Sequence, residues 1–161
     1  MLHRPVGQTG EPFRDEALVA DAHPKFDVSV VTPDGLVYEG EAEMLIVPGQ
    51  AGEIGVLARH APLVATLKAG STRVHLGGNE VLEFATGPGF FKVETDRALA
   101  LVDDAVNVKE IDDARATAQL EAAKAELAKL EEGTASGDRW QFEQRIRHAE
   151  NQLTVSGRTT G

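Results

Sequence analysis

The stretch FDVSVVTPDGLVYEGEAEMLIVPG, residues 26–49, decides the fold class of this chain. Residues 26–30 alternate apolar and polar side chains with the period of two that a half-buried strand requires. Residues 32–35, Thr-Pro-Asp-Gly, combine a proline that presets φ with a glycine that accepts a positive φ, which is turn chemistry. Extended runs resume at residues 36–38 and 44–47. The stretch therefore predicts short β-strands joined by tight turns.

Further short apolar runs continue along the chain, and glycine, proline or asparagine separates most of them. They lie at residues 53–57, 63–67, 72–76, 81–85, 90–93 and 98–102. Many short strands at near-regular spacing, with no long helix among them, are typical of a β-sandwich or barrel. We expect this β domain to cover residues 26–104.

A helical period replaces the strand pattern at residues 110–132, which contain neither glycine nor proline. Apolar residues recur there at spacings of three and four, which defines one helix face. That face consists of Ala116, Leu120, Ala123, Leu127 and Leu130. A second stripe of small residues, which would let another helix approach closely, consists of Ala114, Ala118, Ala122 and Ala125.

A second helix is predicted after the glycine-containing segment 133–137. Asp138 with Gln141 three residues later resembles a capping box. Its apolar face consists of Phe142, Ile146, Ala149 and Leu153. Two helices joined by a short loop predict an antiparallel hairpin over residues 105–161, with a short disordered tail. Because each apolar stripe is narrow, the hairpin should dock only weakly on the β domain, and a partner could select between two positions.

Composition excludes several classes of function. The chain has 161 residues, a formal net charge of −10 and no cysteine. This acidity disfavours nucleic-acid binding, and the absence of a long apolar run disfavours insertion into a membrane. Without cysteine there are no disulfides, thiolate metal sites or cysteine catalysis. Residues 1–25 carry prolines, glycines and mixed charges and are expected to form a flexible extension, with a short helix at 14–20 as the minor alternative.

Few residues suggest catalysis. Glu53 and His60 would form an acid–base pair, with Glu83 as a third group, if the fold brought them together; the alternative is that they decorate an exposed loop. The histidines show no metal-binding spacing, so we expect no metal site. Arg139, Arg145 and Arg147 offer either a basic surface for an acidic partner or ion pairs with the first helix. Trp140 is either a packing anchor or a partner contact.

Three segments together resemble the epsilon subunit of the bacterial F-type ATP synthase. They are residues 26–49, the segment GEIGVLARHAPLVATLKAG at 52–70, and EIDDARA at 110–116. The resemblance covers roughly residues 26–155. It implies an α+β, mainly β fold, in which an N-terminal ten-stranded β-sandwich precedes a C-terminal antiparallel two-helix hairpin.

The resemblance also implies a function. Epsilon subunits are non-catalytic rotor subunits of the central stalk that bind the gamma subunit and the c-subunit ring. Their helices transiently approach the alpha and beta subunits and hinder ATP hydrolysis. The implied location is peripheral, on the cytoplasmic side of the bacterial plasma membrane. The alternatives are a freestanding β-domain adaptor and a small β-fold enzyme that uses Glu53 and His60.

Particular residues acquire expected roles from the resemblance. Glu53, Arg59 and His60 become contacts to the c ring, and Arg59 occupies a position where many relatives have glycine. A second group, expected to bind a nucleotide or dock the hairpin, consists of Ile111, Asp112, Arg115 and Ala116. ATP-binding relatives carry one glutamate and two arginines at the positions that hold Val106, His148 and Gln152 here. We therefore expect weak ATP binding or none, and no other cofactor.

Overall fold

The computed structural model describes residues 23–160, with side chains described up to residue 157. Of the expected extension over residues 1–25, residues 1–22 lie outside the described part. The strands are β1 Phe26–Thr32, β2 Gly35–Ala42, β3 Met44–Gly49, β4 Gly52–Leu57, β5 Leu63–Leu67, β6 Gly70–Gly77, β7 Glu80–Thr86, β8 Gly89–Glu94, β9 Arg97–Val102 and β10 Ala105–Asn107. A short 3-10 helix, η1 Val108–Glu110, leads into α2 Asp113–Glu131 and α3 Arg139–Thr160.

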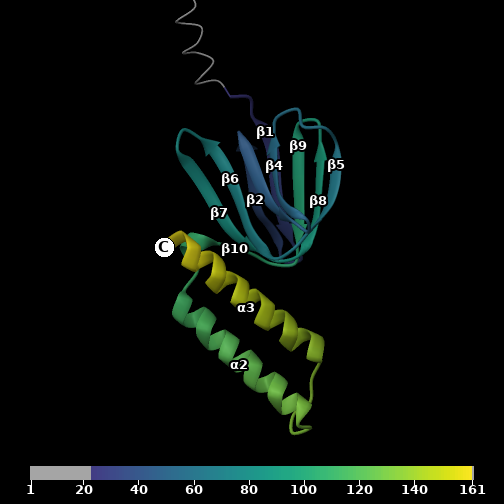
Figure 1. Ribbon diagram of the computed structural model, residues 1–161, viewed down its shortest axis with the longest axis vertical. Coiled ribbons are helices and arrows are strands. Elements are labelled where there is room, and N and C mark those ends of the chain that lie inside the picture. Colours follow the sequence, from purple (N-terminus) through teal and green to yellow (C-terminus); the bar gives the residue numbers. More distant parts are fainter. Residues whose placement is uncertain (1–22, 161) are drawn as a thin grey trace, which may run out of the picture.

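The strands form one ten-stranded sheet that curls into a sandwich (Figure 1). Its order is β10-β7-β6-β3-β5-β8-β9-β1-β2, and β4 pairs with β3 outside this path. Most neighbours are antiparallel, but β1 pairs with β9 in parallel. The quoted stretch forms β1, β2 and β3, and the predicted turn joins β1 to β2 with Thr32 opposite Gly35. The expected fold class, a mainly β sandwich followed by a helical hairpin, is confirmed.

The core of the sandwich follows from the period of two. In β1 the inward residues Phe26, Val28 and Val30 are buried. In β8 two adjacent residues face opposite sides of the sheet: Phe91 is fully buried, whereas Phe90 is 60% exposed. Such alternation buries one apolar face of each strand against the opposite layer, and this burial is the main stabilising term of a sandwich.

The tenth strand shows where the expected domain boundary was wrong. Ala105–Asn107 pairs with β7, with Ala105 opposite Thr86, so these residues belong to the sheet. The β domain therefore ends after residue 107, not after 104. Three half-buried residues show no alternation that would identify a strand from sequence.

Both helices of the hairpin are capped at their N-termini. The side chain of Asp112 accepts a hydrogen bond from the backbone N–H of Arg115 at 3.1 Å, and that of Asp138 accepts one from Trp140 at 2.9 Å. Such caps satisfy helix N–H groups that have no carbonyl partner. Figure 1 shows α3 between α2 and the sandwich, so the second helix provides most of the packing against the β domain. The disordered tail is not seen within the described residues, because α3 continues to Thr160.

Burial in the helices confirms one predicted stripe and not the other. Ala116, Leu120 and Ala123 are the buried residues of α2. Ala149 of α3 is also buried. The second stripe, Ala114, Ala118, Ala122 and Ala125, is exposed. No described helix packs closely on it, although Ala122 lines a cavity together with residues of α3.

Candidate functional site

Polar side chains of α3 attach the hairpin to the sandwich. Gln144, His148 and Asn151 are spaced four and three residues apart, which places them on one helix face. The Asn151 amide donates to the carbonyl oxygens of Thr86 at 2.9 Å and Gly70 at 3.3 Å, at the ends of β7 and β6. We call these three residues the α3 latch. Sequence analysis missed it, because polar residues on one helix face are most often a solvated surface.

The latch meets two carboxylates in the turn between β9 and β10. His148 Nε2 lies 3.2 Å from Asp103 Oδ1, and Nδ1 lies 3.9 Å from Asp104 Oδ2. The shorter contact has the distance of an ion pair without the alignment of a hydrogen bond. The Gln144 amide donates to the other oxygen of Asp103 at 3.3 Å.

The backbone holds this acidic turn in place. The Gly87 N–H donates to Asp104 O at 2.8 Å, and the Asp103 N–H donates to Pro88 O at 3.0 Å. A Cβ at Gly89 would overlap the carbonyl oxygen of Leu101, so this close approach requires glycine. The connection between β7 and β8 thus fixes the position of Asp103 and Asp104 through backbone hydrogen bonds.

The hairpin contact changes the electrostatics of Asp104. Burial raises the pKa of its carboxyl above the ordinary value, because a carboxylate is poorly solvated there. His148 and a hydrogen bond from Gln152 act in the opposite direction, and the neighbouring Asp103 adds to the rise. The ionised carboxylate of Asp104 therefore opposes docking more than it favours it.

A cavity of about 430 Å³ lies between the two helices beside this turn. Its lining includes Asp104, Glu126, Arg145 and His148. The cavity combines groups from the sandwich, α2 and α3, so it exists only while the hairpin is folded against the sandwich.

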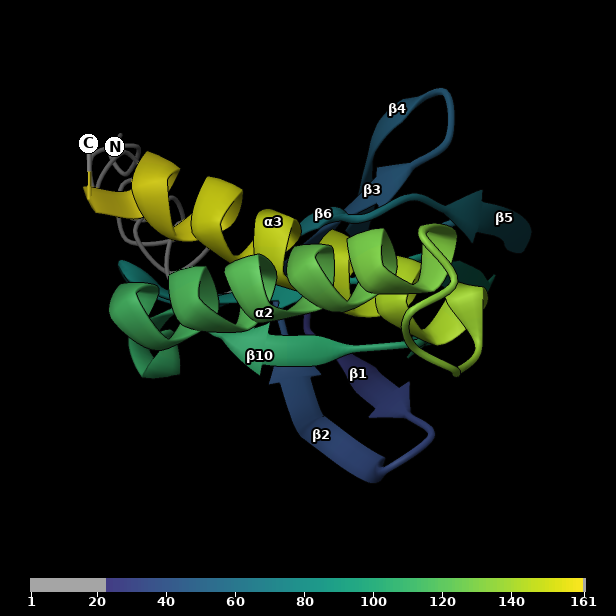
Figure 2. The ribbon, with the colours of Figure 1, turned by 90° about the horizontal axis from the view of Figure 1, so that it is seen from below.

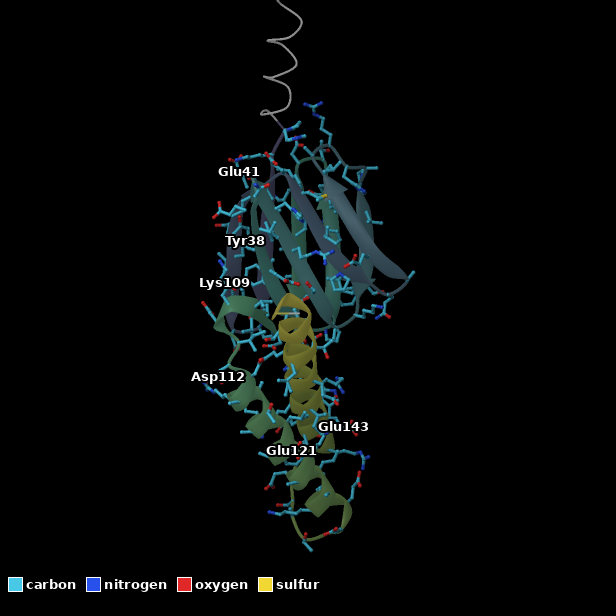
Figure 3. All side chains as sticks on the ribbon, turned by 60° about the vertical axis from the view of Figure 1, so that its left-hand side comes forward. Tyr38, Glu41, Lys109, Asp112, Glu121 and Glu143 are labelled. Atoms are coloured by element: carbon cyan, nitrogen blue, oxygen red, sulfur yellow. The ribbon has the colours of Figure 1, made fainter. Side chains whose placement is uncertain are left out.

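The predicted nucleotide motif lies closer to the start of α2 than this cavity does. Ile111, Asp112, Arg115 and Ala116 line a hollow of about 240 Å³ together with Val106, Glu110, Gln119 and Gln152. Figure 3 shows Asp112 at the start of α2, next to the sandwich. Arg115 is the only cation in this lining, whereas Glu110 and Asp112 are both anions. Triphosphate binding normally needs more positive charge than this.

The motif does not itself provide the described docking contacts. Asp112 caps α2, and Ala116 is buried. The side-chain hydrogen bonds that join the described hairpin to the sandwich come from Gln144 and Asn151. Hairpin docking therefore depends mainly on α3, not on the motif at the start of α2.

Glu53 and His60 do not meet. Glu53 lies near the start of β4, where it forms a 3.0 Å ion pair with Arg73. His60 follows the end of β4, and its Nδ1 lies 2.7 Å from the carbonyl oxygen of Ala61. At about 3.3 Å per residue, β4 alone separates them by roughly 13 Å. The acid–base pair is therefore wrong, and Glu83 instead accepts a hydrogen bond from Ser71.

The β4–β5 connection lies away from the hairpin. Leu57 pairs with Met44, which pairs with His75 near the end of β6, whereas the α3 latch contacts the start of β6. Within this connection Arg59 adopts φ 62° and is the only described non-glycine residue with positive φ. Glycine adopts this conformation without a steric penalty, which explains why it suits the position.

The three arginines of the second helix do not share one role. Arg139 forms ion pairs with Glu131 of α2 at 3.0 Å and Glu143 at 2.8 Å. The guanidinium of Arg145 lies 5.8 Å from the ring centre of Phe142, and Arg147 is exposed. Ion pairing thus accounts for Arg139, while Arg145 and Arg147 remain available to an acidic partner. Trp140 is 56% exposed, so it is not a packing anchor.

One outer face of the sandwich carries exposed apolar side chains. Phe90 of β8 lies directly opposite Leu101 of β9 and Thr66 of β5, and Val64 lies two residues from Thr66 on the same face. Val64 is 72% exposed, Phe90 60% and Leu101 46%. Neighbouring exposed apolar groups of this size typically mark protein–protein contacts. We call these three residues the β8 patch.

Comparisons with known proteins agree with this architecture. The profile of the family described as ATP synthase, Delta/Epsilon chain, beta-sandwich domain matches residues 25–108. The ATP synthase epsilon chain of Halalkalibacterium halodurans is 38% identical over 135 residues, which covers 84% of this chain and 99% of that protein. The epsilon chain of Anoxybacillus flavithermus is 45% identical over 100 residues, or 62% of this chain and 74% of that protein.

A solved structure shares the fold. In the Euglena gracilis mitochondrial ATP synthase, OSCP/F1/c-ring in rotational state 1, one chain matches with a TM-score of 0.61 at 24% identity. The match covers 83% of this chain and 82% of that chain. No described helix is long and apolar enough to cross a membrane. With the sandwich matched along its length and a relative aligned over nearly all of its own, this chain belongs to the ATP synthase delta/epsilon chain family.

Proposed function

We propose that this protein is a rotor subunit that joins the gamma subunit to the c ring and restrains ATP hydrolysis through its C-terminal helices. As an epsilon chain by family, it is an accessory subunit and not itself the catalyst. The proposed location is peripheral, on the cytoplasmic side of the bacterial plasma membrane. The alpha and beta subunits are the proposed transient partners of the hairpin.

The observation that carries this proposal is the polar attachment of the hairpin. Side-chain hydrogen bonds and a histidine–carboxylate pair join α3 to the sandwich, and Ala149 and Val155 are the only buried apolar side chains among the described residues of α3. Water replaces such contacts at a small net cost of roughly 0.5–1.5 kcal/mol each, unlike buried apolar surface. The core of the sandwich meanwhile consists of strand residues alone. The hairpin can therefore detach while the sandwich stays folded, as a movable inhibitory element requires.

The β8 patch is the proposed contact for gamma. It lies on a rigid face of the sandwich, and a partner that covers it would remove three large apolar side chains from water. Pro88 and Asp103, which belong to or neighbour the acidic turn, line the same shallow hollow as Phe90 and Leu101. A partner on this face would therefore lie next to the attachment of the hairpin.

The proposed c-ring contact runs along β4 and the β4–β5 connection. β4 pairs only with β3 in the described sheet, so one of its edges is open. Figure 2 shows the β3–β4 hairpin projecting to one side of the helices. Glu53 lies near one end of this strand and Arg59 and His60 beyond the other, so a contact to all three must follow its length.

ATP binding by the hairpin is proposed to be weak or absent. The hollow at the motif contains one guanidinium against two carboxylates, and Val106 and Gln152 contribute no charge. Calorimetry of the full chain with Mg-ATP tests this. Little or no heat is expected; strong heat release that Arg115→Ala abolishes would contradict the proposal.

The regulatory proposal is tested with an epsilon-depleted ATP synthase. Adding the full chain should lower ATP hydrolysis, whereas a chain truncated after Glu110 should assemble without this effect. Truncation at Glu110 retains β10, which the sheet needs. Inhibition that persists in the truncated protein would show that the helices are not the brake.

The gamma contact is tested by one charged substitution. Phe90→Asp should abolish co-purification with gamma, because burying an unpaired carboxylate is costly. Val81→Asp, at a 39% exposed position of β7, is the matched control and should leave co-purification unchanged. Equal behaviour of the two variants would place gamma elsewhere.

The alternatives lack support. The small β-fold enzyme required Glu53 and His60 to act together, and they lie apart. The freestanding adaptor differs from the rotor subunit only in its partner, and relatives carry the name of an ATP synthase chain.

A further inference from the structure

An apolar strip crosses four neighbouring strands on one face of the sheet. Leu57 of β4 lies opposite Met44 of β3. Met44 in turn lies opposite His75 of β6, and His75 lies opposite Val81 of β7. Residues that lie directly opposite each other in a sheet point to the same face. Ile46, two residues after Met44 in β3, points to this face as well. We call these five residues the β3 patch.

The β3 patch faces away from the core. The alternate residues of the same strands are fully buried, namely Leu45, Val56 and Val74. On the patch itself Leu57 is 59% exposed and Val81 39%, and the other three residues are half-buried. Gly55, which lies opposite Ile46, leaves open space where a side chain would stand. The patch is therefore an apolar outer surface that no described residue covers completely.

The β3 patch is separate from the two contacts already described on the sandwich. The α3 latch reaches β6 at Gly70, five residues before His75, which corresponds to roughly 16 Å along a strand. The β8 patch belongs to β5, β8 and β9, which contribute nothing to the β3 patch. The proposed c-ring contact is its neighbour, since Leu57 lies between Glu53 and Arg59 in the sequence.

The described part of the chain begins beside this patch. β1 starts at Phe26, which lies opposite Ala42 at the end of β2, and only Glu43 separates Ala42 from Met44. Figure 1 shows the start of β1 at one end of the sandwich and the helices at the other. Residues 1–22, which precede the described part, therefore join the sandwich at the end that carries the patch.

The sequence of this preceding segment includes an apolar part within reach. Residues 13–20, Phe-Arg-Asp-Glu-Ala-Leu-Val-Ala, contain the large apolar side chains Phe13, Leu18 and Val19. Phe13 is ten residues from His23, the first described residue, and an extended chain spans up to roughly 33 Å over that length. The patch is three strand spacings wide, or about 14 Å. The segment is therefore long enough to reach across the whole patch.

The size of the β3 patch favours an occupant from the same chain. Only two of its five side chains are more than a third exposed. That surface is far smaller than the roughly 800 Å² per partner that a stable interface between separate chains buries. A tethered segment needs less area, because a short linker keeps it at an effective concentration on the order of a millimolar.

We propose that residues 13–20 dock on the β3 patch and bury their large apolar side chains against it. Removal of apolar surface from water on both sides drives the contact. The docked segment covers Leu57 and leaves the ends of β4, with Glu53 and Arg59, to the proposed c-ring contact. The inference does not depend on the rotor function, because the contact lies within one chain.

The test places one nitroxide label in the segment. Because the sequence has no cysteine, Arg14→Cys creates a unique labelling site in the full chain. The unpaired electron broadens the amide proton signals of residues close to the label, and nuclear magnetic resonance measures this broadening residue by residue. We expect strong broadening at the β3 patch and little at the β8 patch.

Two matched substitutions sharpen the test. Leu57→Asp should lower the ratio of docked to free segment at least about fivefold, because docking would bury an unpaired carboxylate. Leu36→Asp is the control, since Leu36 is 58% exposed and lies next to the β1–β2 turn, at the opposite end of β1 from Phe26. It should leave the ratio unchanged. Leu18→Asp, in the segment itself, should act like Leu57→Asp.

Four outcomes would overturn the inference: no selective broadening at the β3 patch, broadening centred on the β8 patch, undiminished broadening in Leu57→Asp, or broadening that arises only between labelled and unlabelled chains in a mixture. The last outcome would identify a second copy of the chain as the occupant. The proposed function is judged separately, by hydrolysis in the reconstituted synthase, so an undocked segment in a chain that still inhibits would leave the rotor function standing.

Discussion

The sandwich and the hairpin of this protein are held together by different physics. Within the sandwich, side chains such as Val28, Leu45 and Phe91 are completely removed from water. Partly exposed polar side chains join α3 to the sandwich through hydrogen bonds and a histidine–carboxylate pair, and the described residues of α3 bury only two apolar side chains, Ala149 and Val155. When two surfaces separate, the free energy gained by apolar burial is lost in full, whereas polar groups replace their lost contacts with hydrogen bonds to water. The difference indicates that the sandwich is a stable unit and that the hairpin can change its position on it.

The largest expected effect concerns the core of the persistent region. Phe91→Ala should lower the free energy of unfolding by about 3–5 kcal/mol, because it removes a fully buried ring and leaves a cavity. Phe90→Ala, one residue away and 60% exposed, should cost less than about 1 kcal/mol. Urea unfolding followed by circular dichroism measures both. Similar losses would mean that β8 does not separate an inner from an outer face.

Removing the movable region should have a smaller effect. A chain ending at Glu110 should keep a cooperatively unfolding sandwich, with a change of about 1–3 kcal/mol for the few lost polar contacts. Urea unfolding of the truncated and full chains gives the difference. If the truncated chain did not unfold cooperatively, hairpin and sandwich would share one core.

Asp104 links the two regions through its charge. Burial raises the pKa of its carboxyl, so the docked state favours the protonated form. This carboxyl therefore permits docking most at pH values below its ordinary pKa of 3.8 and opposes it as the pH rises through the raised value. Asp104→Asn should increase the docked fraction at about pH 8 by a few-fold, because the amide carries no charge that docking removes from water.

Pulsed electron-paramagnetic-resonance distances between spin labels at Glu41→Cys on the sandwich and Glu121→Cys on α2 measure this change, because the sequence has no other cysteine. Asp34→Asn, in the exposed β1–β2 turn, is the control and should have no effect. A docked fraction that falls in Asp104→Asn would mean that the attraction of Asp104 to α3 outweighs its burial.

The smallest effect is expected at Arg59. Arg59→Gly should leave stability unchanged or raise it by up to about 1 kcal/mol, because glycine relieves the positive φ but gains freedom in the unfolded chain. Arg97→Gly, at an exposed position of β9, should instead lower stability by about 0.5–1 kcal/mol. Thermal unfolding compares the two. Equal losses would argue against strain at Arg59.

Much of the local structure was predictable from the sequence. Every apolar run of the β domain became a strand, and the second helix began after Asp138 as expected, whereas α2 begins at Asp113 and not at residue 110. These features depend on neighbours in the chain: alternation, turn residues and caps act over a few residues. Ile111, Asp112, Arg115 and Ala116, which the resemblance selected, line one hollow, and their binding role stays a prediction.

The candidate site was less predictable. His148 and Asp103 are far apart in sequence, and neither spacing nor composition pairs them. The α3 latch had no sequence signal, because a polar helix face against a sheet end looks like a polar face against water. Glu53 and His60 are the reverse case. They are close in the sequence, but the extended strand β4 lies between them and keeps them apart.

Apart from β10, the sequence by itself determined which segments are strands and which are helices, because these choices depend on side-chain period and backbone preference within each segment. Only the tertiary structure decided the parallel pairing of β1 with β9, the addition of β10 beside β7, and the meeting of α3 with the acidic turn. Those pairings depend on how well surfaces from distant parts of the sequence fit together and on which polar groups find partners. The free energy of such a contact depends on both segments, so neither segment alone can predict it.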